Sequence, residues 1–335
     1  MTPARAIPPP AARVAAARGA AAVLAAPGRV RLRRVARREP GSGEVEVRVE
    51  GCGVCGSNVP VWAGRPWFAY PLRPGSPGHE GWGEVVRVGD GVTSLRAGQR
   101  VAFLSDTSFA EYDTVGADGA VPLPAALDGL PFPGEALGCV VNVMRRAAVR
   151  AGDLVAVVGV GFLGALVTNA AARAGAHVIA LSRRPFALEV ARQMGADAAL
   201  RMADRGDAPA RVAALAGGEL CDVVVEATGS QHGLDLAAEL VRVRGRLVVA
   251  GYHQDGPRQV NMQLWNWRGI DVVNAHERDR PVYVRGIQDA AREVAAGRLD
   301  VGPLLTHLFP LARLGDALEV ASARPPGFLK AVVMP

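Results

Sequence analysis

The chain has few cysteines, one lysine and little aromatic content. Its 335 residues include four cysteines, and Phe, Trp and Tyr make up only 5% of them. So few cysteines in so long a chain argue against a disulfide framework and predict a reducing compartment, the cytoplasm. The net charge of +6 comes almost wholly from arginines scattered among acidic residues. Because a nucleic-acid surface requires clustered positive charge, no nucleic-acid partner is predicted.

Long hydrophobic runs are also lacking. The longest apolar stretches have the length of a strand and end at glycine or at a charge, so neither a transmembrane helix nor a membrane partner is predicted. Residues 1–18 contain no sustained apolar segment, which argues against a secretory signal, and Pro8-Pro9-Pro10 interrupts any helix there. We therefore expect residues 1–18 to be a disordered extension.

The pattern of the chain changes near its middle, and its length favours two domains over one. From residue 19 to about 118, short strands alternate with glycine-containing turns, as in Glu44–Glu50, Gly83–Val88 and Arg100–Phe103. That pattern predicts an antiparallel barrel or sandwich. Later, continuous apolar strands alternate with helical segments, which predicts a parallel sheet covered on both faces. The predicted strands of this sheet are Leu154–Val158, His177–Leu181, Cys221–Glu226, Arg246–Ala250 and Gly269–Asn274, and the predicted helices include Ala165–Ala174, Phe186–Met194 and Val284–Ala296.

A glycine fingerprint follows the strand Leu154–Val158 directly and opens a helical segment. In that context the first glycine forms a tight turn, the second lets a pyrophosphate approach the backbone, and the third lets helix and strand pack closely. The chain is therefore predicted to bind a dinucleotide. The predicted cofactor-binding residues are Gly159, Gly161, Phe162, Leu163 and Gly164, together with Thr228 and Gly251 farther along the chain.

The end of the next predicted strand indicates which dinucleotide binds. A site that prefers NAD places a carboxylate there, whereas this chain has Ser182 followed by Arg183 and Arg184. Two guanidinium groups can bind a 2′-phosphate, which a carboxylate would repel. We therefore predict NADP. NAD is the alternative if the two arginines are simply solvated.

Three side chains of the types that bind metals precede the fingerprint. Cys55 and His79 each lie in a glycine-containing segment, and Glu135 lies 24 positions before Gly159. A thiolate, an imidazole and a carboxylate suit Zn²⁺ with an open fourth position. Cys139, one helical turn beyond Glu135, competes as third ligand. Two other interpretations stay open: Cys55 could form a redox pair with Cys52, and His79 alone could be a turn residue.

Several of these segments together resemble one enzyme family. Gly53–Ser57, Gly78–Glu80, Gly98–Val101 and the glycine fingerprint are similar to the zinc-dependent medium-chain dehydrogenase/reductase family, from about residue 19 to the C-terminus. Glu135–Leu137, followed by Arg145-Arg146, is most similar to the sorbitol and threonine dehydrogenase branch. The resemblance implies an α/β protein with a GroES-like catalytic domain (residues 19–142 and 281–335) and a doubly wound Rossmann domain (residues 143–280). It also implies a dimer or tetramer paired through the strand Gly269–Asn274.

The same resemblance implies roles for individual residues. Cys55, His79 and Glu135 would bind zinc, Glu80 would lie beside the metal, and Ser57 would take the proton of the ionising alcohol before hydride passes to C4 of the nicotinamide. One catalytic zinc and no structural zinc are expected, because a short segment, Leu104–Ser108, stands where many relatives carry a four-cysteine lobe. The chain departs from the family at Asn58, where an aspartate commonly orients a ligand histidine. It departs again at Pro60, where some alcohol dehydrogenases have a relay histidine.

The predicted function is therefore hydride transfer between a secondary alcohol and NADP, or the reverse reduction. The substrate would be a polyol, an amino alcohol or a cyclitol. Aromatic residues around Arg65 fit a substrate pocket and a domain core equally well; they are Trp62, Trp67, Phe68 and Tyr70. Two alternatives stay open. One is a zinc-independent NADPH-dependent reductase of C=C or C=N bonds, which Asn58 favours, and the other is a non-catalytic NADPH-binding protein.

Overall fold

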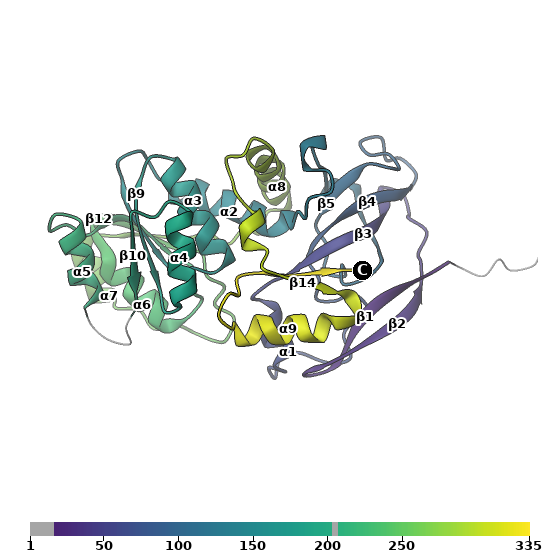
Figure 1. The fold of residues 1–335 in the computed structure, drawn as a ribbon, viewed down its shortest axis with the longest axis horizontal. Coiled ribbons are helices and arrows are strands. Elements are labelled where there is room, and N and C mark those ends of the chain that lie inside the picture. Colours follow the sequence, from purple (N-terminus) through teal and green to yellow (C-terminus); the bar gives the residue numbers. More distant parts are fainter. Residues whose placement is uncertain (1–16, 203–206) are drawn as a thin grey trace, which may run out of the picture.

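A computed structural model describes residues 17–202 and 207–335 of the protein. Residues 1–16, most of the predicted N-terminal extension, lie outside the described residues, as do 203–206. Arg18, which the prediction placed in that extension, begins strand β1 (Arg18–Ala26), which forms an antiparallel ribbon with β2 (Arg29–Ala36). Two bodies lie side by side, one rich in strands and one in which helices surround a sheet (Figure 1). None of the described helices is both long and apolar enough to cross a bilayer.

The first body is built on a seven-stranded sheet in the order β14-β15-β3-β4-β5-β7, with β6 paired to β3. Its strands are β3 (Glu44–Val54), β4 (Glu80–Val88), β5 (Arg100–Phe103), β6 (Tyr112–Gly116), β7 (Ala120–Pro122), β14 (His307–Pro310) and β15 (Ala331–Met334). The pairs are antiparallel except β14 with β15. As the alternation in β3 predicts, Val45, Val47 and Val49 are buried in the core. The C-terminal strands β14 and β15 thus form one end of a sheet whose other strands lie between residues 44 and 122 (Figure 1).

The second body is built on a six-stranded parallel sheet in the order β10-β9-β8-β11-β12-β13. Its strands are β8 (Leu154–Val158), β9 (His177–Ser182), β10 (Ala198–Arg201), β11 (Cys221–Glu226), β12 (Val241–Val249) and β13 (Asp271–Asn274). The chain adds β9 and β10 on one side of β8, and then returns to add β11, β12 and β13 on the other. Open parallel sheets bind ligands beyond the carboxyl ends of their strands at such a switch point. The predicted parallel sheet is confirmed.

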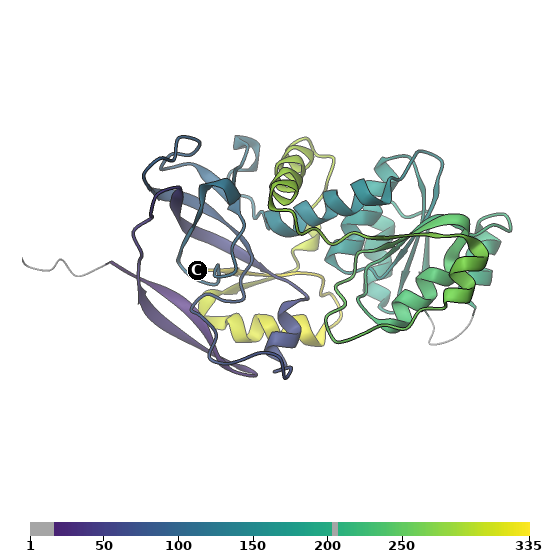
Figure 2. The ribbon, with the colours of Figure 1, turned by 180° about the vertical axis from the view of Figure 1, so that it is seen from behind.

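Helices cover this sheet and join the two bodies. Those of the second body are α3 (Phe162–Arg173), α4 (Pro185–Gln193), α5 (Ala208–Leu215), α6 (Gln231–Leu240) and α7 (Met262–Arg268). The others are α1 (Asn58–Trp62), α2 (Gly134–Ala147), α8 (Arg280–Ala295) and α9 (Leu314–Ala323), with 3₁₀ turns at Ala117–Gly119, Ala125–Leu127, Gly302–Leu304 and Leu311–Arg313. Helices α2 and α8 pack on each other where the two bodies meet, as the view from behind shows (Figure 2).

Several elements begin earlier than their patterns predict, and strand β12 and helix α8 show the largest shifts. Strand β12 begins at Val241 rather than at Arg246, because the preceding helix α6 ends directly against it at Leu240. Helix α8 begins at Arg280 rather than at Val284, since Asp279 accepts a hydrogen bond from the Val282 N–H at its first turn. The added turn contains Tyr283.

Candidate active site

Cys55 follows the end of β3, and its backbone is held in place by Asn58. Asn58 Oδ1 accepts a hydrogen bond from the Cys55 N–H (2.9 Å), and Asn58 Nδ2 donates one to the Pro77 carbonyl (3.1 Å). Asn58 is almost wholly buried, with 1% of its surface exposed. Asn58 therefore ties the segment that carries Cys55 to the segment that carries His79. Both of these bonds go to main-chain groups, and neither goes to a histidine ring.

His79 is oriented by a backbone carbonyl instead. Its Nδ1 lies 2.9 Å from the Pro77 carbonyl oxygen, to which it donates, so Nε2 is left toward Ser57, whose Oγ is 3.5 Å away. Burial alone lowers the pKa of His79, but the hydrogen bond and negative charge of Cys55, followed by the charges of Glu135 and Glu80, raise it to about 10. These neighbouring groups thus favour the protonated, positively charged form of His79.

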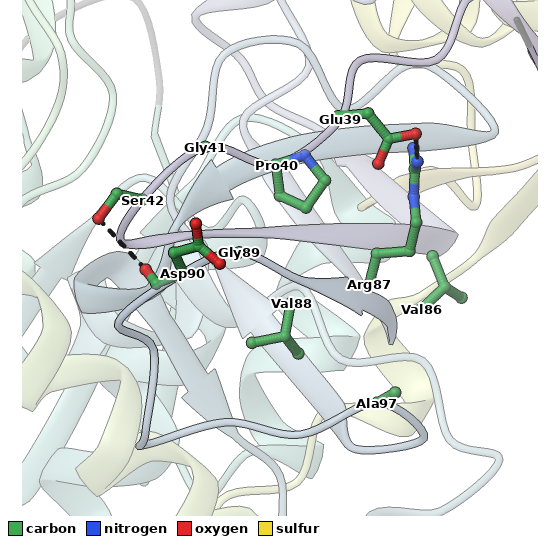
Figure 3. A pocket seen from close by; sticks show the side chains of 10 residues that line it. All are labelled: Glu39, Pro40, Gly41, Ser42, Val86, Arg87, Val88, Gly89, Asp90 and Ala97. Carbon is green, nitrogen blue, oxygen red and sulfur yellow. Dashed lines mark hydrogen bonds and ion pairs between the residues drawn. The ribbon is translucent and has the colours of Figure 1, made fainter.

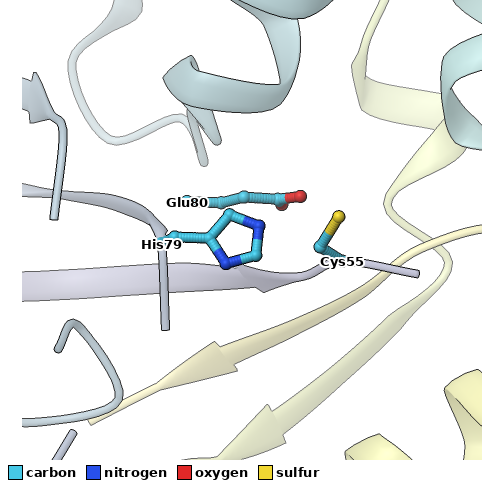
Figure 4. A group of neighbouring side chains, drawn as sticks. All are labelled: Cys55, His79 and Glu80. Carbon is cyan, nitrogen blue, oxygen red and sulfur yellow. The ribbon is translucent and has the colours of Figure 1, made fainter. Parts of the chain in front are cut away.

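Cys55, His79 and Glu80 form a compact group of metal-binding side chains. Their ligand atoms all lie within 4.8 Å of one another (Figure 4). Glu80, however, is engaged by a residue that the sequence reasoning missed: Lys330 Nζ lies 2.6 Å from its Oε1 and 2.5 Å from its Oε2. Both side chains are buried. The sequence does contain one indication of a special role for Lys330, because it is the one lysine of the chain.

Glu135 lies beside this group but is not part of it. It occupies the first turn of α2, and its Oε1 accepts a hydrogen bond from the Tyr283 hydroxyl of α8. Burial raises the pKa of Glu135, whereas the charge of His79 lowers it. Cys139 Sγ is 3.6 Å from the same oxygen and 3.0 Å from the Tyr283 hydroxyl. Tyr283 is the second residue that sequence reasoning missed, since nothing in its local sequence indicates that α8 packs against α2.

The donor set fits a divalent cation. Cys55, Glu80 and Glu135 are acidic groups; the basic side chains bonded to them are Lys330, which pairs with Glu80, and His79, which is hydrogen-bonded to Cys55. Carboxylate and thiolate charges that are removed from water need compensation, which a divalent cation would supply more fully than these two groups. A thiol, an imidazole and a carboxylate are together typical of zinc. All four cysteines are unpaired, so the described structure contains no Cys52–Cys55 disulfide.

The glycine fingerprint has the geometry that a phosphate-binding turn requires. Gly159 has a φ of +101°, and a Cβ on Gly164 would lie 2.0 Å from the Gly159 carbonyl oxygen, so both positions require glycine for the fold itself. A Cβ on Gly161 would meet nothing within 4 Å, although Gly161 caps the N-terminus of α3. This glycine therefore leaves space for a ligand at a helix end that attracts anions.

The other predicted cofactor residues surround the same switch point. Thr228 follows β11, and its Cγ2 would contact a Cβ added to Gly159 at 2.6 Å. Gly251 follows β12, and its added Cβ would lie 2.2 Å from the Gly229 N–H nitrogen. The buried carboxylate of Glu226 supports this loop, since it accepts hydrogen bonds from the Thr228 hydroxyl and from His253 Nε2. The ends of three strands, β8, β11 and β12, thus meet beside the fingerprint.

The two arginines after β9 are used differently. Arg183 is exposed, whereas the Arg184 guanidinium donates to the carbonyls of Phe328 (2.6 Å) and Val160 (3.1 Å). Burial, with the nearby charge of Arg324, lowers the pKa of Arg184. Ser182 is buried and accepts a hydrogen bond from the Arg184 N–H. Arg184 therefore bridges the fingerprint and the C-terminal segment, which the sequence did not predict.

The metal-type cluster and the fingerprint meet at one contact. Lys330 Nζ lies 4.8 Å from the ring centroid of Phe162, the first residue of α3. The same ammonium is paired with Glu80. The two predicted halves of the site, which are far apart in the sequence, are therefore adjacent in the structure.

Most of the aromatic residues near Arg65 belong to the core. Trp62, Phe68 and Tyr70 pack against a cluster formed by β1, β3, α9 and β15, which favours the core interpretation over the pocket for these three. Trp67 is half exposed. A surface hollow of about 410 Å³ between residues 39–42 and 86–90 contains none of the predicted site residues (Figure 3).

A strand-rich body that carries thiol, imidazole and carboxylate groups, joined to a parallel sheet with a dinucleotide fingerprint, defines the class of medium-chain dehydrogenases. Residues 41–125 match the model of the alcohol dehydrogenase GroES-like domain, and residues 163–289 match that of the zinc-binding dehydrogenases. This chain belongs to the zinc-dependent medium-chain alcohol dehydrogenase family, in its sorbitol dehydrogenase branch, and is an oxidoreductase. The predicted fold class and family are confirmed.

Two individual relatives and one solved structure agree with this family assignment. The chain is 30% identical over 326 residues to sorbitol dehydrogenase of Gallus gallus, covering 84% of this chain and 87% of that protein. It is 28% identical over 316 residues to L-galactonate-5-dehydrogenase of Escherichia coli (strain K12), covering 84% and 88%. A crystal structure from Sinorhizobium meliloti 1021, described as a zinc-binding dehydrogenase bound to NADP, is 25% identical with a TM-score of 0.80, covering 95% of this chain and 100% of that chain.

Proposed function

We propose that this dehydrogenase oxidises a secondary hydroxyl of a polyol, or of a related amino alcohol or cyclitol, with zinc and NADP. The observation that carries the proposal is the approach of Cys55 and His79 within 4.8 Å of each other, in a cluster that Lys330 connects to the first turn of α3. Two relatives named for sorbitol and L-galactonate support a polyhydroxylated substrate.

Cys55, His79 and Glu135 hold the zinc in this proposal. Glu80 would lie beside the metal rather than bind it, because the Lys330 ammonium contacts both of its oxygens. When bound, zinc supplies the Lewis acidity that favours ionisation of the substrate hydroxyl, and NADP supplies the acceptor for the hydride. Asn58, which favoured a zinc-free reductase, bonds the backbones of both ligand-bearing segments, and this supports a preorganised metal site.

Ser57 takes the proton of the hydroxyl. Its Oγ lies next to His79 Nε2, and the side chain is partly exposed, so the proton has a path to water. Pro60 lies in the adjoining helix α1 and offers no titratable group to extend that path. We expect Ser57→Ala to lower kcat more than it changes KM, because the hydroxyl acts on the proton rather than on binding.

Metal content tests the zinc assignment. We expect one zinc per chain in the purified protein, and we expect Cys55→Ala to lose both the zinc and alcohol-dependent reduction of NADP⁺. Cys221→Ala is the matched control, because that thiol lies in β11 of the other body and should leave zinc content unchanged. Turnover by metal-free Cys55→Ala protein would refute the proposal.

Cofactor choice is tested by the two adjacent arginines. We propose that Arg183, which is exposed, binds the 2′-phosphate of NADP, whereas Arg184 mainly holds the fingerprint to the C-terminal segment. Arg183→Ala should lower the ratio of kcat/KM for NADP⁺ over NAD⁺ by about tenfold, the worth of one charge-assisted contact. Arg184→Ala should lower thermal stability with less effect on that ratio. A wild-type preference for NAD⁺ would contradict the NADP assignment.

We also propose a homodimer formed through β13. This strand is the edge of the parallel sheet, and Val272 and nearby Trp267 are exposed, with 41% and 87% of their surfaces accessible. An exposed strand edge pairs readily with a second copy. Sedimentation should show a dimer or tetramer that Val272→Asp dissociates, and a wild-type monomer would contradict this. The four unpaired thiols support a cytoplasmic location.

A further inference from the structure

The order of the parallel strands indicates where each half of the dinucleotide lies. Arg183, the proposed ligand of the 2′-phosphate, follows β9, and the glycine fingerprint follows β8. Strands β9, β8, β11 and β12 are successive neighbours in the sheet. A dinucleotide that extends from β9 past the fingerprint therefore has its adenosine half beyond β9 and its nicotinamide half beyond β11 and β12.

The chain beyond β11 is held by a buried carboxylate. Glu226 ends β11 and is fully buried. Its Oε1 accepts hydrogen bonds from the backbone N–H groups of Thr228 (2.6 Å) and Gly229 (2.8 Å). Its Oε2 lies 2.9 Å from Nε2 of His253, which follows β12. One carboxylate thus connects the turn after β11 to the segment after β12, residues 251–259.

Arg258 determines which nitrogen of His253 carries the proton. Arg258 Nε lies 2.8 Å from His253 Nδ1. Because a guanidinium group only donates hydrogen bonds, Nδ1 accepts, and the ring proton lies on Nε2, which donates it to Glu226. Only 13% of the His253 side chain and 16% of the Arg258 side chain are exposed. The imidazole is therefore a neutral connector between a buried carboxylate and a guanidinium group, and its orientation is fixed by both.

Two further contacts fasten the end of this segment. Arg258 Nη2 donates a hydrogen bond to the Gly229 carbonyl (3.0 Å). Gln231, in the first turn of α6, donates to the Gln259 carbonyl (2.8 Å) and accepts from the Gln259 N–H (3.0 Å). The segment is thus bonded to the connection between β11 and α6 at three of its positions, in addition to its covalent attachment to β12.

The segment and the fingerprint are linked by direct contacts. A Cβ on Gly251 would lie 2.2 Å from the Gly229 nitrogen, and a Cβ on Gly159 would lie 2.6 Å from Thr228 Cγ2. Packing at these distances leaves no free space between the segment after β12, the turn after β11 and the first glycine of the fingerprint. The hydrogen-bonded side chains of this segment therefore set the spacing of the surfaces that face the nicotinamide half of the cofactor.

We propose that His253 and Arg258 are positioning residues that hold the binding surface for the nicotinamide half of the dinucleotide. The inference rests on the proposed NADP site. Both residues act through groups that follow or end β11, whereas Arg183 lies beyond β9, on the other side of β8. Loss of His253 should therefore weaken contacts with the nicotinamide half and leave those with the adenosine half intact.

A cofactor fragment separates the two halves. Adenosine 2′,5′-bisphosphate carries the adenosine and the 2′-phosphate but no nicotinamide. In His253→Leu, calorimetric titration should show NADPH binding weakened about tenfold, the effect of losing one charge-assisted hydrogen bond, and binding of the fragment unchanged. His253→Gln should keep most of the wild-type affinity for NADPH, because its amide supplies both a donor and an acceptor. His177→Leu is the matched control, since that histidine lies at the amino end of β9 and should change neither affinity.

A double-variant cycle tests whether the two residues act as one unit. Arg258→Met should also weaken NADPH binding about tenfold and leave binding of the fragment unchanged. His253→Leu combined with Arg258→Met should weaken NADPH binding by less than the product of the two single effects. If His253→Leu does not fold, Arg258→Met decides by the same comparison of NADPH with the fragment.

The outcomes distinguish the inference from the function on which it rests. Equal weakening of NADPH and of the fragment, or no weakening of NADPH in the two single variants, would overturn the inference while leaving the dinucleotide site intact. Wild-type protein that binds NADH but not NADPH would instead refute the NADP assignment. The comparison of NADH with ADP in the same variants would then decide the inference.

Discussion

The two halves of the candidate active site are built in different ways. The dinucleotide half is local: five of its predicted residues lie within the six positions from Gly159 to Gly164, which run from the end of β8 into the first turn of α3. The metal half draws on segments around residues 55, 79, 135, 283 and 330. The dinucleotide half consists of a backbone turn whose glycines leave room for a ligand, and the metal half consists of side chains whose charges must balance. A turn that depends on neighbouring residues can therefore be predicted from the sequence, whereas a balance of charges from distant segments cannot.

Removing Lys330 should have the largest effect, because this residue serves both halves. In Lys330→Met the buried Glu80 carboxylate loses its partner, which should lower the unfolding free energy of the metal-free protein by about 3–5 kcal/mol. Urea unfolding measures this. The double variant Glu80→Gln with Lys330→Met should recover most of the loss, since no uncompensated charge remains. Equal stability of wild type and Lys330→Met would show that the pair carries no such charge.

A methyl group on Gly161 should impair the dinucleotide half of the site and leave the metal half unchanged. The added Cβ meets no protein atom within 4 Å, so Gly161→Ala should keep the thermal unfolding midpoint and the zinc content of the wild type. It should nevertheless weaken NADPH binding by about tenfold or more, because the pyrophosphate needs that space. Fluorescence titration measures the affinity. Gly164→Ala is the contrast, since its Cβ would collide with the Gly159 carbonyl and should damage folding. Unimpaired NADPH binding by Gly161→Ala would contradict the proposed phosphate position.

The smallest effect is expected from acid, in a region that belongs to neither half. Burial alone raises the pKa of Glu46, but Arg37 and Arg87 hold it below the ordinary value of 4.5. The pKa of Glu46 is thus lower in the folded state than in the unfolded state. Its ion pairs with the two arginines therefore stabilise the fold above about pH 4.5, and this stabilisation is lost as the pH falls through the folded-state pKa. Glu46→Gln should therefore flatten the fall of unfolding free energy in acid while keeping zinc and NADPH. If Glu46→Gln leaves the dependence of unfolding free energy on acid pH unchanged, this role of the Glu46 carboxylate is contradicted.

Sequence patterns predicted the elements of this protein well and their long-range partners poorly. The runs Leu154–Val158 and Cys221–Glu226 form strands with the predicted bounds, because a continuous apolar run leaves a buried parallel strand as the natural outcome. Arg184 shows the limit. Its residue type suggested a phosphate ligand, but its guanidinium donates to two carbonyl groups, one of them 144 positions away.

The chain by itself determined the two sheets, the glycine turn and the presence of Cys55 and His79 in short glycine-bounded segments, since these depend on periodicity and on backbone freedom within a few residues. Only the tertiary structure placed Lys330 against Glu80 and Tyr283 between Glu135 and Cys139. The physical reason is that compensation of buried charge depends on distance in space. That distance is set by how β15 and α8 return to the first body, which no local pattern encodes.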